Sequence, residues 1–405
     1  MPDAPSTVLV TVTGQDRPGV TSALFETIAD VGAEVVDLEQ QIVRGHVSLA
    51  FLLAVGGRED LLCGAVTSVA DRLGLQVAVT AGVGDNPRRS GRAAVVVLGA
   101  PLMASAMSAV TTRITRHGAN IDRIRRLSRW PVTTLELDVS GADVPTLRRE
   151  LALEASTHGV DVAVSPGGLA RRGRRLVVMD VDSTLIRDEV IDLLAGMAGR
   201  ESEVAEVTAA AMRGELDFAD SLRARVRLLA GLPESAIARV RDRLRLTPGA
   251  RTLVRTLRRL GFTVALVSGG FVEVVAPLAG ELGITHLRAN RLEVRDGLLT
   301  GELVGEVVDR AGKARALQEL AALEGLPLHR TVAIGDGAND LDMLAAAGLG
   351  IAFNAKPLVR EQADTSVNVP YLDAVLYLLG ISREEIEEAD AAAPDVRMRP
   401  WSSTT

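Results

Sequence analysis

Residues 176–187, with the sequence LVVMDVDSTLIR, contain the side chains best suited to chemistry. The uninterrupted apolar run at the start is typical of a strand buried on both faces of a parallel sheet. Ligands of such sheets bind beyond the carboxyl ends of the strands, which is where Asp180 and Asp182 fall. Side chains two residues apart on an extended segment point the same way. Because two close carboxylates repel each other, we expect a divalent cation or a proton between them.

Other polar clusters end two later apolar runs. Residues 268–270 (SGG) follow TVALV, residues 335–340 (GDGAND) follow TVAI, and Lys313 opens the helix predicted between them. Parallel strands bring such termini together. The carboxylates of these clusters can bind a hard cation. Their hydroxyl and N–H groups, together with the lysine ammonium, can bind anionic oxygens. Each cluster alone is also typical of a turn or helix cap. Their combination predicts phosphoryl transfer with Asp180 as nucleophile.

Lysine is nearly absent from the chain. Of the 45 basic residues only Lys313 and Lys356 are lysines, and arginine supplies all other positive charge. The compact ammonium of lysine and the planar guanidinium of arginine are not interchangeable. The two retained lysines are therefore candidates for positions that arginine cannot fill.

The composition predicts a globular protein of two or three domains, with 405 residues of which 47% are apolar and 24% charged. The net charge of -7 argues against a general nucleic-acid binder. A single cysteine, Cys63, excludes intrachain disulfides and is expected to be a core residue. The first residues resemble neither a signal sequence nor a membrane span, so we expect a cytoplasmic protein without membrane partners. The five histidines lack zinc-ligand spacing.

The order of predicted elements divides the chain into three domains and a tail. Residues 1–83 read as β-α-β-β-α-β, and residues 92–168 repeat that order, which predicts two small α+β domains. Residues 174–390 alternate strands and helices, as a doubly wound, Rossmann-like α/β domain does. A helical insertion at about 188–247, directly after the first strand, would form a cap. Asp296-Gly297 predicts a hairpin turn, and residues 391–405 are expected to be disordered.

The motifs DVDSTL, VSGGF, a lone lysine and AIGDGANDLDML resemble the haloacid dehalogenase superfamily of phosphatases over residues 174–382. Within that superfamily EVIDLLA, AAMRGELDF, SLRARV, GKARAL and GIAFNAKP resemble the phosphoserine phosphatases. The resemblance implies a Mg²⁺-dependent enzyme that hydrolyses O-phospho-L-serine in the last step of L-serine biosynthesis. A phosphatase or phosphotransferase for another small phospho-metabolite, and a non-catalytic amino-acid sensor, are the alternatives.

The same resemblance implies roles for the strand-end residues. Asp180 would attack phosphorus and form an aspartyl-phosphate, and Asp182 would first protonate the leaving oxygen and then activate water. Asp180, Asp336 and the backbone carbonyl of Asp182 would hold Mg²⁺, with Asp340 supporting the metal or its waters. Lys313 would neutralise phosphoryl oxygens.

Substrate contacts are implied in the same way. Ser268 and the N–H of Gly269 would bind phosphoryl oxygens, and Asn339 would orient the phosphate. The amino group and carboxylate of phosphoserine would meet Glu189 and Arg225 respectively; further pocket residues would be Met212 and Phe218. Without the resemblance, Arg225 also fits a solvated helix face, and Met212 and Phe218 fit plain packing.

The segment TGQDRPGVTSALF in the first repeat resembles the ACT domain, an amino-acid-sensing module. Asp16 and Gly19 lie before the first helix, where free N–H groups would receive the carboxylate of L-serine, although an ordinary turn also fits. The second repeat reads GAPLMASAM there and lacks both residues. We therefore expect feedback by L-serine at the first copy, and a homodimer or higher homo-oligomer formed through the ACT-like domains.

Overall fold

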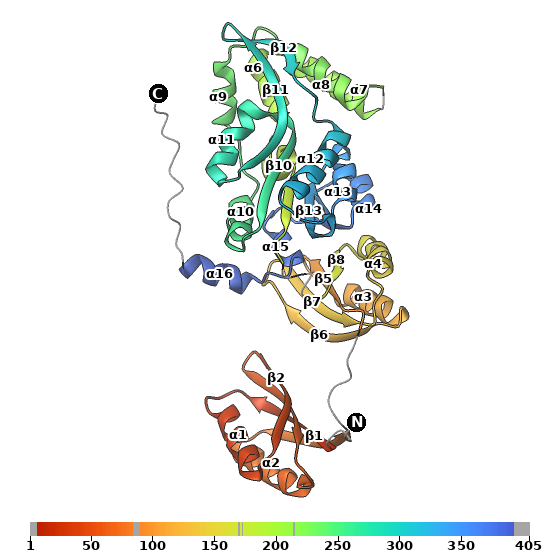
Figure 1. Ribbon diagram of the computed structural model, residues 1–405, viewed down its shortest axis with the longest axis vertical. Coiled ribbons are helices and arrows are strands. Elements are labelled where there is room, and N and C mark those ends of the chain that lie inside the picture. The colour runs from red at the N-terminus through yellow and green to blue at the C-terminus, as the bar shows by residue number, and fades with distance from the viewer. Residues whose placement is uncertain (1–5, 84–89, 169–170, 172, 214, 393–405) are drawn as a thin grey trace. The chain divides into compact units, whose positions relative to one another are not determined.

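The computed structural model describes residues 6–83, 90–168, 171, 173–213 and 215–392 (Figure 1). The chain forms two compact units that divide between residues 88 and 89. The first unit is one α+β domain, and the second contains another α+β domain together with the large α/β domain.

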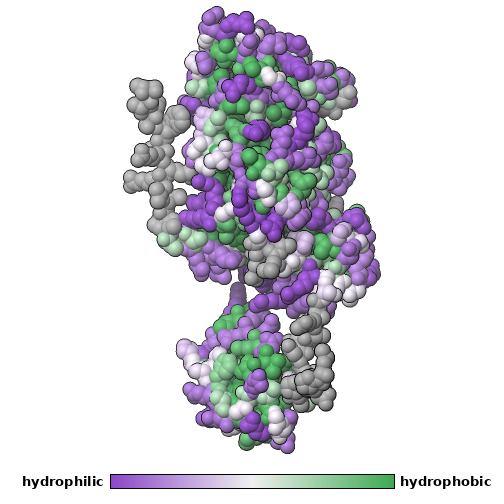
Figure 2. Space-filling model, in the orientation of Figure 1, coloured by the Kyte–Doolittle hydropathy of each residue, from purple (hydrophilic) through white to green (hydrophobic). Residues whose placement is uncertain are grey.

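The first unit is a four-stranded antiparallel sheet covered by two helices, in the order β2-β3-β1-β4. Leu24 of the first helix and Phe51 of the third strand are fully buried between the layers. The second strand stays open to solvent, and Val35, Ile42 and Val43 are 44–59% exposed along it. Figure 2 shows apolar surface on this unit. The elements are β1 (Ser6–Gln15), α1 (Val20–Val31), β2 (Glu34–Val43), β3 (His46–Ala54), α2 (Glu59–Leu73) and β4 (Gln76–Val83).

The second α+β domain repeats this topology, with the strand order β6-β7-β5-β8. The predicted tandem β-α-β-β-α-β repeat is therefore confirmed. Its elements are β5 (Ala93–Gly99), α3 (Ala104–Arg116), β6 (Asn120–Arg126), β7 (Thr133–Ser140), α4 (Val144–His158) and β8 (Asp161–Pro166).

The open face of this second sheet packs against the α/β domain. Val96, Leu98 and Ala163 belong to the same hydrophobic cluster as Val177 and Met179 of the first α/β strand. As a result every residue of β5 is buried. We predicted pairing between subunits for this domain, and the structure adds a contact within the chain that the sequence did not predict.

Polar contacts extend this intrachain interface. The Asp161 carboxylate on β8 is 3% exposed and accepts hydrogen bonds from Ser366 Oγ (2.5 Å), Asn368 N (2.9 Å) and Asn368 Nδ2 (2.6 Å). Burial raises the pKa of Asp161, and these hydrogen bonds oppose the rise. Arg148 Nη1 on α4 pairs with Asp364 Oδ1 at 3.0 Å. The second α+β domain is thus anchored to the edge of the larger sheet.

That larger sheet has seven strands in the order β12-β11-β10-β9-β13-β14-β15. Its central strands are parallel, with β9 between β10 and β13, as the predicted doubly wound fold requires. Figure 1 shows α10 and α11 on one side of the sheet and α12 to α14 on the other. The strands are β9 (Leu176–Met179), β10 (Thr263–Phe271), β11 (His286–Arg295), β12 (Leu298–Val304), β13 (Thr331–Gly335), β14 (Leu349–Phe353) and β15 (Thr365–Val367).

The helices of this domain cover both faces and leave the carboxyl ends of the strands free. Asp296 and Gly297 have φ values of 52° and 74°, as a tight turn between β11 and β12 requires. The helices are α10 (Ala250–Arg259), α11 (Val272–Leu282), α12 (Arg310–Leu323), α13 (Leu341–Ala346), α14 (Pro357–Gln362), α15 (Ala374–Leu378) and α16 (Arg383–Ala392), with short turns η2 (Leu328–Arg330) and η3 (Ala338–Asp340).

The cap follows β9 and a tight turn, η1 (Val181–Leu185). The chain enters the cap at Ile186 and leaves it at Leu246, and these two residues form an antiparallel bridge. Beside them Asp188 accepts hydrogen bonds from the backbone N and the side chain of Arg245. The cap helices are α6 (Val190–Ala198), α7 (Glu201–Met212), α8 (Phe218–Arg227) and α9 (Ser235–Arg241).

Two sequence expectations need correction. Cys63 is exposed on α2 and is not a core residue, because the apolar face of that helix is formed by Leu62, Val66 and Val69. The expected tail begins later than residue 391, because α16 continues to Ala392 and Asp390 on it pairs with Arg255 and Arg259 of α10. Residues 393–405 lie outside the described residues. None of the described helices is long and apolar enough to cross a membrane.

The interface around Asp161 predicts a stability effect. Asp161→Ala should lower the free energy of unfolding by about 1–3 kcal/mol, because it removes the buried acceptor of three hydrogen bonds from Ser366 and Asn368. Thermal unfolding of the intact chain measures this as a lower Tm. Glu319→Ala, which removes an exposed carboxylate on α12, is the control and should leave Tm unchanged. Equal Tm values for the two variants would contradict the proposed anchoring.

Candidate active site

The carboxyl ends of β9, β10 and β13 bring the predicted residues together. The backbone N–H of Asp180, directly after β9, donates to the carbonyl of Ile334 on β13 at 2.9 Å. The N–H of Val181 donates to Asp180 Oδ1 at 2.8 Å, and the following turn places Ser183 at φ 54°. Asp180 is therefore fixed both by its backbone and by its carboxylate.

Lys313 is the cation at the base of this site. Its side chain is 0% exposed, and its Nζ lies 2.9 Å from Asp180 Oδ1 and 2.6 Å from Asp340 Oδ1. Burial alone would lower the pKa of Lys313, but the two carboxylates outweigh it and hold that pKa above its ordinary value. An ammonium has three donors, so the two aspartates leave one for another oxygen.

Asp340 also organises the loop after β13. Its Oδ2 accepts hydrogen bonds from the backbone N of Asp336 (3.1 Å) and Gly337 (2.9 Å). A side chain at Gly335 is excluded, because its Cβ would lie 2.4 Å from the Asp340 carboxyl carbon. Thr184 Oγ1 donates to Asp336 Oδ1 at 2.7 Å. The loop thus presents the Asp336 carboxylate next to Asp180.

Asp180, Asp336 and Asp340 each offer an oxygen within 4.8 Å of the others. Burial, with the nearby Asp340 charge, raises the pKa of Asp336 to about 7 and that of Asp180 well above its usual range. Closely spaced carboxylate oxygens of this kind fit a hard divalent cation, which would offset their mutual repulsion. The Asp182 side chain lies outside this cluster, and its predicted metal contact is through its backbone carbonyl.

Asp182 is a partly buried carboxyl group with one unpartnered oxygen. Its Oδ1 has no hydrogen-bond partner among the described residues. Burial, and then the charge of Glu189, raise the pKa of Asp182 well above its usual range. Gly270 lies close by, since a Cβ there would be 3.2 Å from Asp182 Oδ2. A carboxyl group whose pKa is raised holds its proton more readily than a free aspartate, which suits general acid chemistry.

The carboxyl end of β10 is held by a residue that was not predicted from the sequence, Asn290. Ser268 Oγ is fully buried and accepts a hydrogen bond from Gly270 N at 2.8 Å. Asn290 Nδ2 donates to the carbonyl of Gly269 at 2.9 Å, and Asn290 Oδ1 accepts from Val308 N at 2.8 Å. No sequence motif marked Asn290, because its role depends on strand β11 lying next to β10.

A cavity of about 590 Å³ lies between these strand ends and the cap. Three of the residues predicted to bind substrate, Asn339, Gly269 and Phe218, line it. The lining also includes Asp180, Asp182, Glu189, Ile191, Thr208, Ala211, Leu216, Ser221, Leu222, Arg225, Gly270, Phe271, Arg310, Asp336, Gly337, Ala338, Lys356, Leu358 and Val359. Met212 is the last residue of α7, and its side chain lies outside what the structure describes.

The cap contributes one acid and one base to this cavity. Glu189 is exposed to solvent, and its carboxylate accepts a hydrogen bond from Ser183 Oγ at 2.7 Å. Surrounding protein partly desolvates Glu189 and raises its pKa, which the Ser183 hydrogen bond opposes. Burial lowers the pKa of Arg225, and the negative charges of Asp192 and Glu189 only partly offset this decrease. Arg225 is partly buried and lines the cavity, so it does not lie on a fully solvated helix face.

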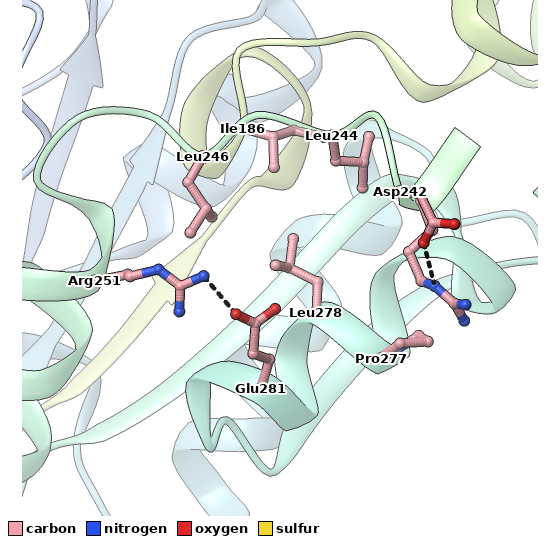
Figure 3. Close-up of a pocket in the computed structure, with 9 residues that line it drawn as sticks. Ile186, Asp242, Leu244, Leu246, Arg251, Pro277, Leu278 and Glu281 are labelled. Carbon is pink, nitrogen blue, oxygen red and sulfur yellow. Dashed lines mark hydrogen bonds and ion pairs between the residues drawn. The ribbon is translucent and has the colours of Figure 1, made fainter. Parts of the chain in front are cut away.

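A second, smaller cavity of about 250 Å³ lies behind the entry and exit of the cap (Figure 3). Ile186, Leu246 and Leu278 give it an apolar lining. Its charged side chains pair with each other, Arg241 with Asp242 and Arg251 with Glu281. This cavity does not contain the carboxylate cluster, so it does not match the predicted chemistry.

The predicted effector loop lies in the first unit. Gly19 precedes α1 with φ 95°, a conformation that favours glycine. Asp16 is exposed, and its backbone N–H donates to the carbonyl of Gly45 at 2.7 Å. Both residues are accessible at the start of α1, and nothing lies within 4 Å of a Cβ placed on Gly19.

Comparison with known proteins agrees with this arrangement. The haloacid dehalogenase-like hydrolase family matches residues 177–345, and ACT domain families match residues 6–80 and 92–165. Phosphoserine phosphatase of Streptomyces coelicolor is 59% identical over 96% of both chains. Phosphoserine phosphatase SerB2 of Mycobacterium tuberculosis is 51% identical over 96% of this chain and 97% of its own. A solved structure of a probable phosphoserine phosphatase from Vibrio cholerae, in unliganded form, is 35% identical with a TM-score of 0.55, over 76% of this chain and 90% of that one.

Fold, site and relatives together define an enzyme that hydrolyses phosphoric monoesters. The chain belongs to the phosphoserine phosphatase family of haloacid dehalogenase-like hydrolases, with two ACT domains.

The raised pKa values predict how stability depends on pH and metal. Without metal, folded Asp336 retains a proton up to about pH 7, whereas unfolded aspartate loses it near pH 4. The free energy of unfolding should therefore fall as pH rises through this window. A divalent cation such as Mg²⁺ would bind the deprotonated form of these carboxylates, so it should raise Tm more at about pH 8 than at about pH 5. Thermal unfolding in EDTA and in Mg²⁺ measures both effects.

Asp336→Asn is the matched variant for this measurement. It removes the titrating group and a predicted cation ligand, so both the pH slope and the Mg²⁺ shift should shrink. A Mg²⁺ shift in Tm that is the same at both pH values in the unmodified protein would contradict the prediction.

Proposed function

We propose that this chain hydrolyses O-phospho-L-serine to L-serine and phosphate in a Mg²⁺-dependent reaction, as the last step of L-serine biosynthesis. The observation that carries the proposal is a single cavity lined by Asp180, Asp182, Glu189 and Arg225. The first two serve phosphoryl transfer, and the other two match the charges of an amino acid. The names of relatives that cover nearly the whole chain support the same substrate.

In the proposed first step Asp180 attacks phosphorus. A bond forms between the carboxylate oxygen and phosphorus, the bond from phosphorus to the serine oxygen breaks, and an aspartyl-phosphate results. Protonated Asp182 gives its proton to the leaving oxygen. This assignment is supported by the raised pKa of Asp182 and by its unpartnered Oδ1.

In the second step the Asp182 carboxylate accepts a proton from water, and that water attacks the phosphorus of the aspartyl-phosphate. Phosphate leaves, and Asp180 is restored. Lys313 has one donor free of its two aspartates for a phosphoryl oxygen. Ser268 and the N–H of Gly269 are assigned to the other phosphoryl oxygens, and Asn339 to orienting the group.

Asp180, Asp336 and the carbonyl of Asp182 would hold Mg²⁺, with Asp340 as a supporting residue. The close carboxylate oxygens of this cluster support the assignment. The bound cation would supply charge that lowers the repulsion between phosphate and carboxylates.

Substrate selection is assigned to the cap. Glu189 would bind the ammonium of phosphoserine, and Arg225 would bind its carboxylate, for which a guanidinium fork is suited. Phe218 and Met212 would limit the space beside the substrate carbon chain. A phosphatase for another phospho-metabolite, and transfer of phosphate to an alcohol, remain the alternatives, and a panel of substrates and acceptors separates them by kcat/KM.

Asp180→Asn tests the nucleophile. Phosphoserine turnover with Mg²⁺ should fall about a thousandfold or more, because an amide cannot form the aspartyl-phosphate. Asp296→Asn, in the exposed hairpin turn, is the matched control and should keep full activity. The measurement is phosphate release, together with trapping of acid-stable phosphate on the protein. Undiminished turnover in Asp180→Asn would disprove the assignment.

We also propose that L-serine inhibits the enzyme by binding at the first ACT domain, near Asp16 and Gly19. The start of α1, which no side chain caps, and the open space above Gly19 support this site. The exposed apolar strand β2 supports pairing of subunits through the same domain.

Gly19→Ala tests the regulatory site. It should weaken inhibition by L-serine about tenfold while leaving kcat without serine unchanged, because a Cβ at φ 95° strains the loop that would receive the ligand. Gly57→Ala carries the same strain at φ 82°, with nothing within 4 Å of its Cβ, beyond the end of β3 that lies away from Asp16, and serves as control. Equal serine inhibition in the unmodified and Gly19→Ala proteins would contradict the site.

A further inference from the structure

Lys356 is the lysine for which the proposed mechanism has no role. It lies after β14, where Asn354 adopts φ 45° and its N–H donates to the carbonyl of Val367 at 2.9 Å. Pro357 then begins α14, and the N–H of Val359 donates to the Lys356 carbonyl at 3.0 Å. The backbone of Lys356 is therefore fixed on both sides.

The Lys356 side chain lines the active-site cavity on the wall that α14 forms with Leu358 and Val359. It is exposed, and it has no hydrogen-bond or ion-pair partner in the part of the chain that the structure describes. The other cations of the core that reach this region are engaged. Arg310 hydrogen-bonds Asp342 at 2.5 and 2.7 Å, and Lys313 lies between two aspartates.

The charges around the cavity explain what an unpaired ammonium does there. Asp180, Asp336 and Asp340 cluster at its base, and Glu189 lines its cap side. A phosphate dianion that approaches these carboxylates is repelled at first. A cation at the mouth of a low-dielectric cavity attracts such a ligand and raises its rate of association. A lysine ammonium on a flexible stem can follow the ligand inward.

We propose that Lys356 binds the phosphate group at the cavity mouth, where it receives the incoming phosphomonoester and contacts inorganic phosphate as it leaves. This inference rests on the proposed phosphatase function. It gives the second lysine of the chain a role in substrate binding that is separate from the reaction at Asp180.

The test compares Lys356→Gln and Lys356→Arg with the unmodified full-length chain. Arg360→Gln is the matched control, because it removes an exposed cation of the same short helix that does not line the cavity. Steady-state kinetics with O-phospho-L-serine give kcat and KM at several salt concentrations. Competitive inhibition by inorganic phosphate gives Ki, and Tm reports folding.

For Lys356→Gln we expect KM and the phosphate Ki to rise about fivefold with kcat within about twofold, as for an exposed charged contact. The fall of kcat/KM with added salt should become shallower. Lys356→Arg should restore KM, the phosphate Ki and the salt dependence most of the way to those of the unmodified protein. Arg360→Gln should match the unmodified protein in all three.

The inference is overturned if Lys356→Gln has the KM, Ki and salt dependence of the unmodified protein, or if Arg360→Gln shows the same changes. It is also overturned if Lys356→Gln lowers kcat alone. Failure of the unmodified protein to hydrolyse O-phospho-L-serine would instead refute the proposed substrate, and the Kd for inorganic phosphate, measured by calorimetry on the unmodified and Lys356→Gln proteins, would still test Lys356.

Discussion

The buried contact of Lys313 with Asp180 and Asp340 is the interaction on which the rest of the site depends. These side chains come from the end of β9, the first turn of α12 and the loop after β13, so one ammonium joins three elements. Removing one partner of a buried charge pair is costly, because it leaves an uncompensated charge. Asp336 adds a third carboxylate to a single cation. Burial and this excess of negative charge together raise the pKa values of Asp180 and Asp336, and the same excess would favour binding of a divalent cation.

Thr184 links this charged cluster to the cap. Its hydroxyl donates to Asp336 Oδ1, and its carbonyl accepts a hydrogen bond from Thr247 Oγ1 at 2.7 Å. Thr247 directly follows the bridge between Ile186 and Leu246, where the chain leaves the cap. The cation site and the base of the cap therefore share one residue. Glu189 and Arg225, which are assigned to substrate selection, belong to the cap that begins and ends at this base.

The site residues that directly follow parallel strands could be predicted from sequence. A doubly wound sheet brings the carboxyl ends of its strands together, however its helices are arranged. Asp180, Lys313 and the GDGAND loop belong to this group. The role of Asn290 could not be predicted, because it depends on which strand lies next to β10. Thr184 was part of a recognised motif, but its two partners lie far away in the chain. The exposure of Cys63 was misjudged from its apolar neighbours, since helical spacing and not neighbourhood decides which face is buried.

The two ACT domains differ in how much of the sheet is buried, and the sequences of their first strands reflect this difference. β5 reads AAVVVLG and is buried along its whole length, whereas β1 alternates valine with threonine over VLVTVT and leaves Leu9 40% exposed. A continuous apolar strand indicates cover on both faces, and an alternating one indicates an open face. The second domain therefore acts as a fixed part of the phosphatase. Its Asp161 holds the residues on either side of Val367, whose carbonyl accepts the N–H of Asn354 next to the Lys356 turn. The first domain retains the open sheet face and the accessible loop that a sensing module requires.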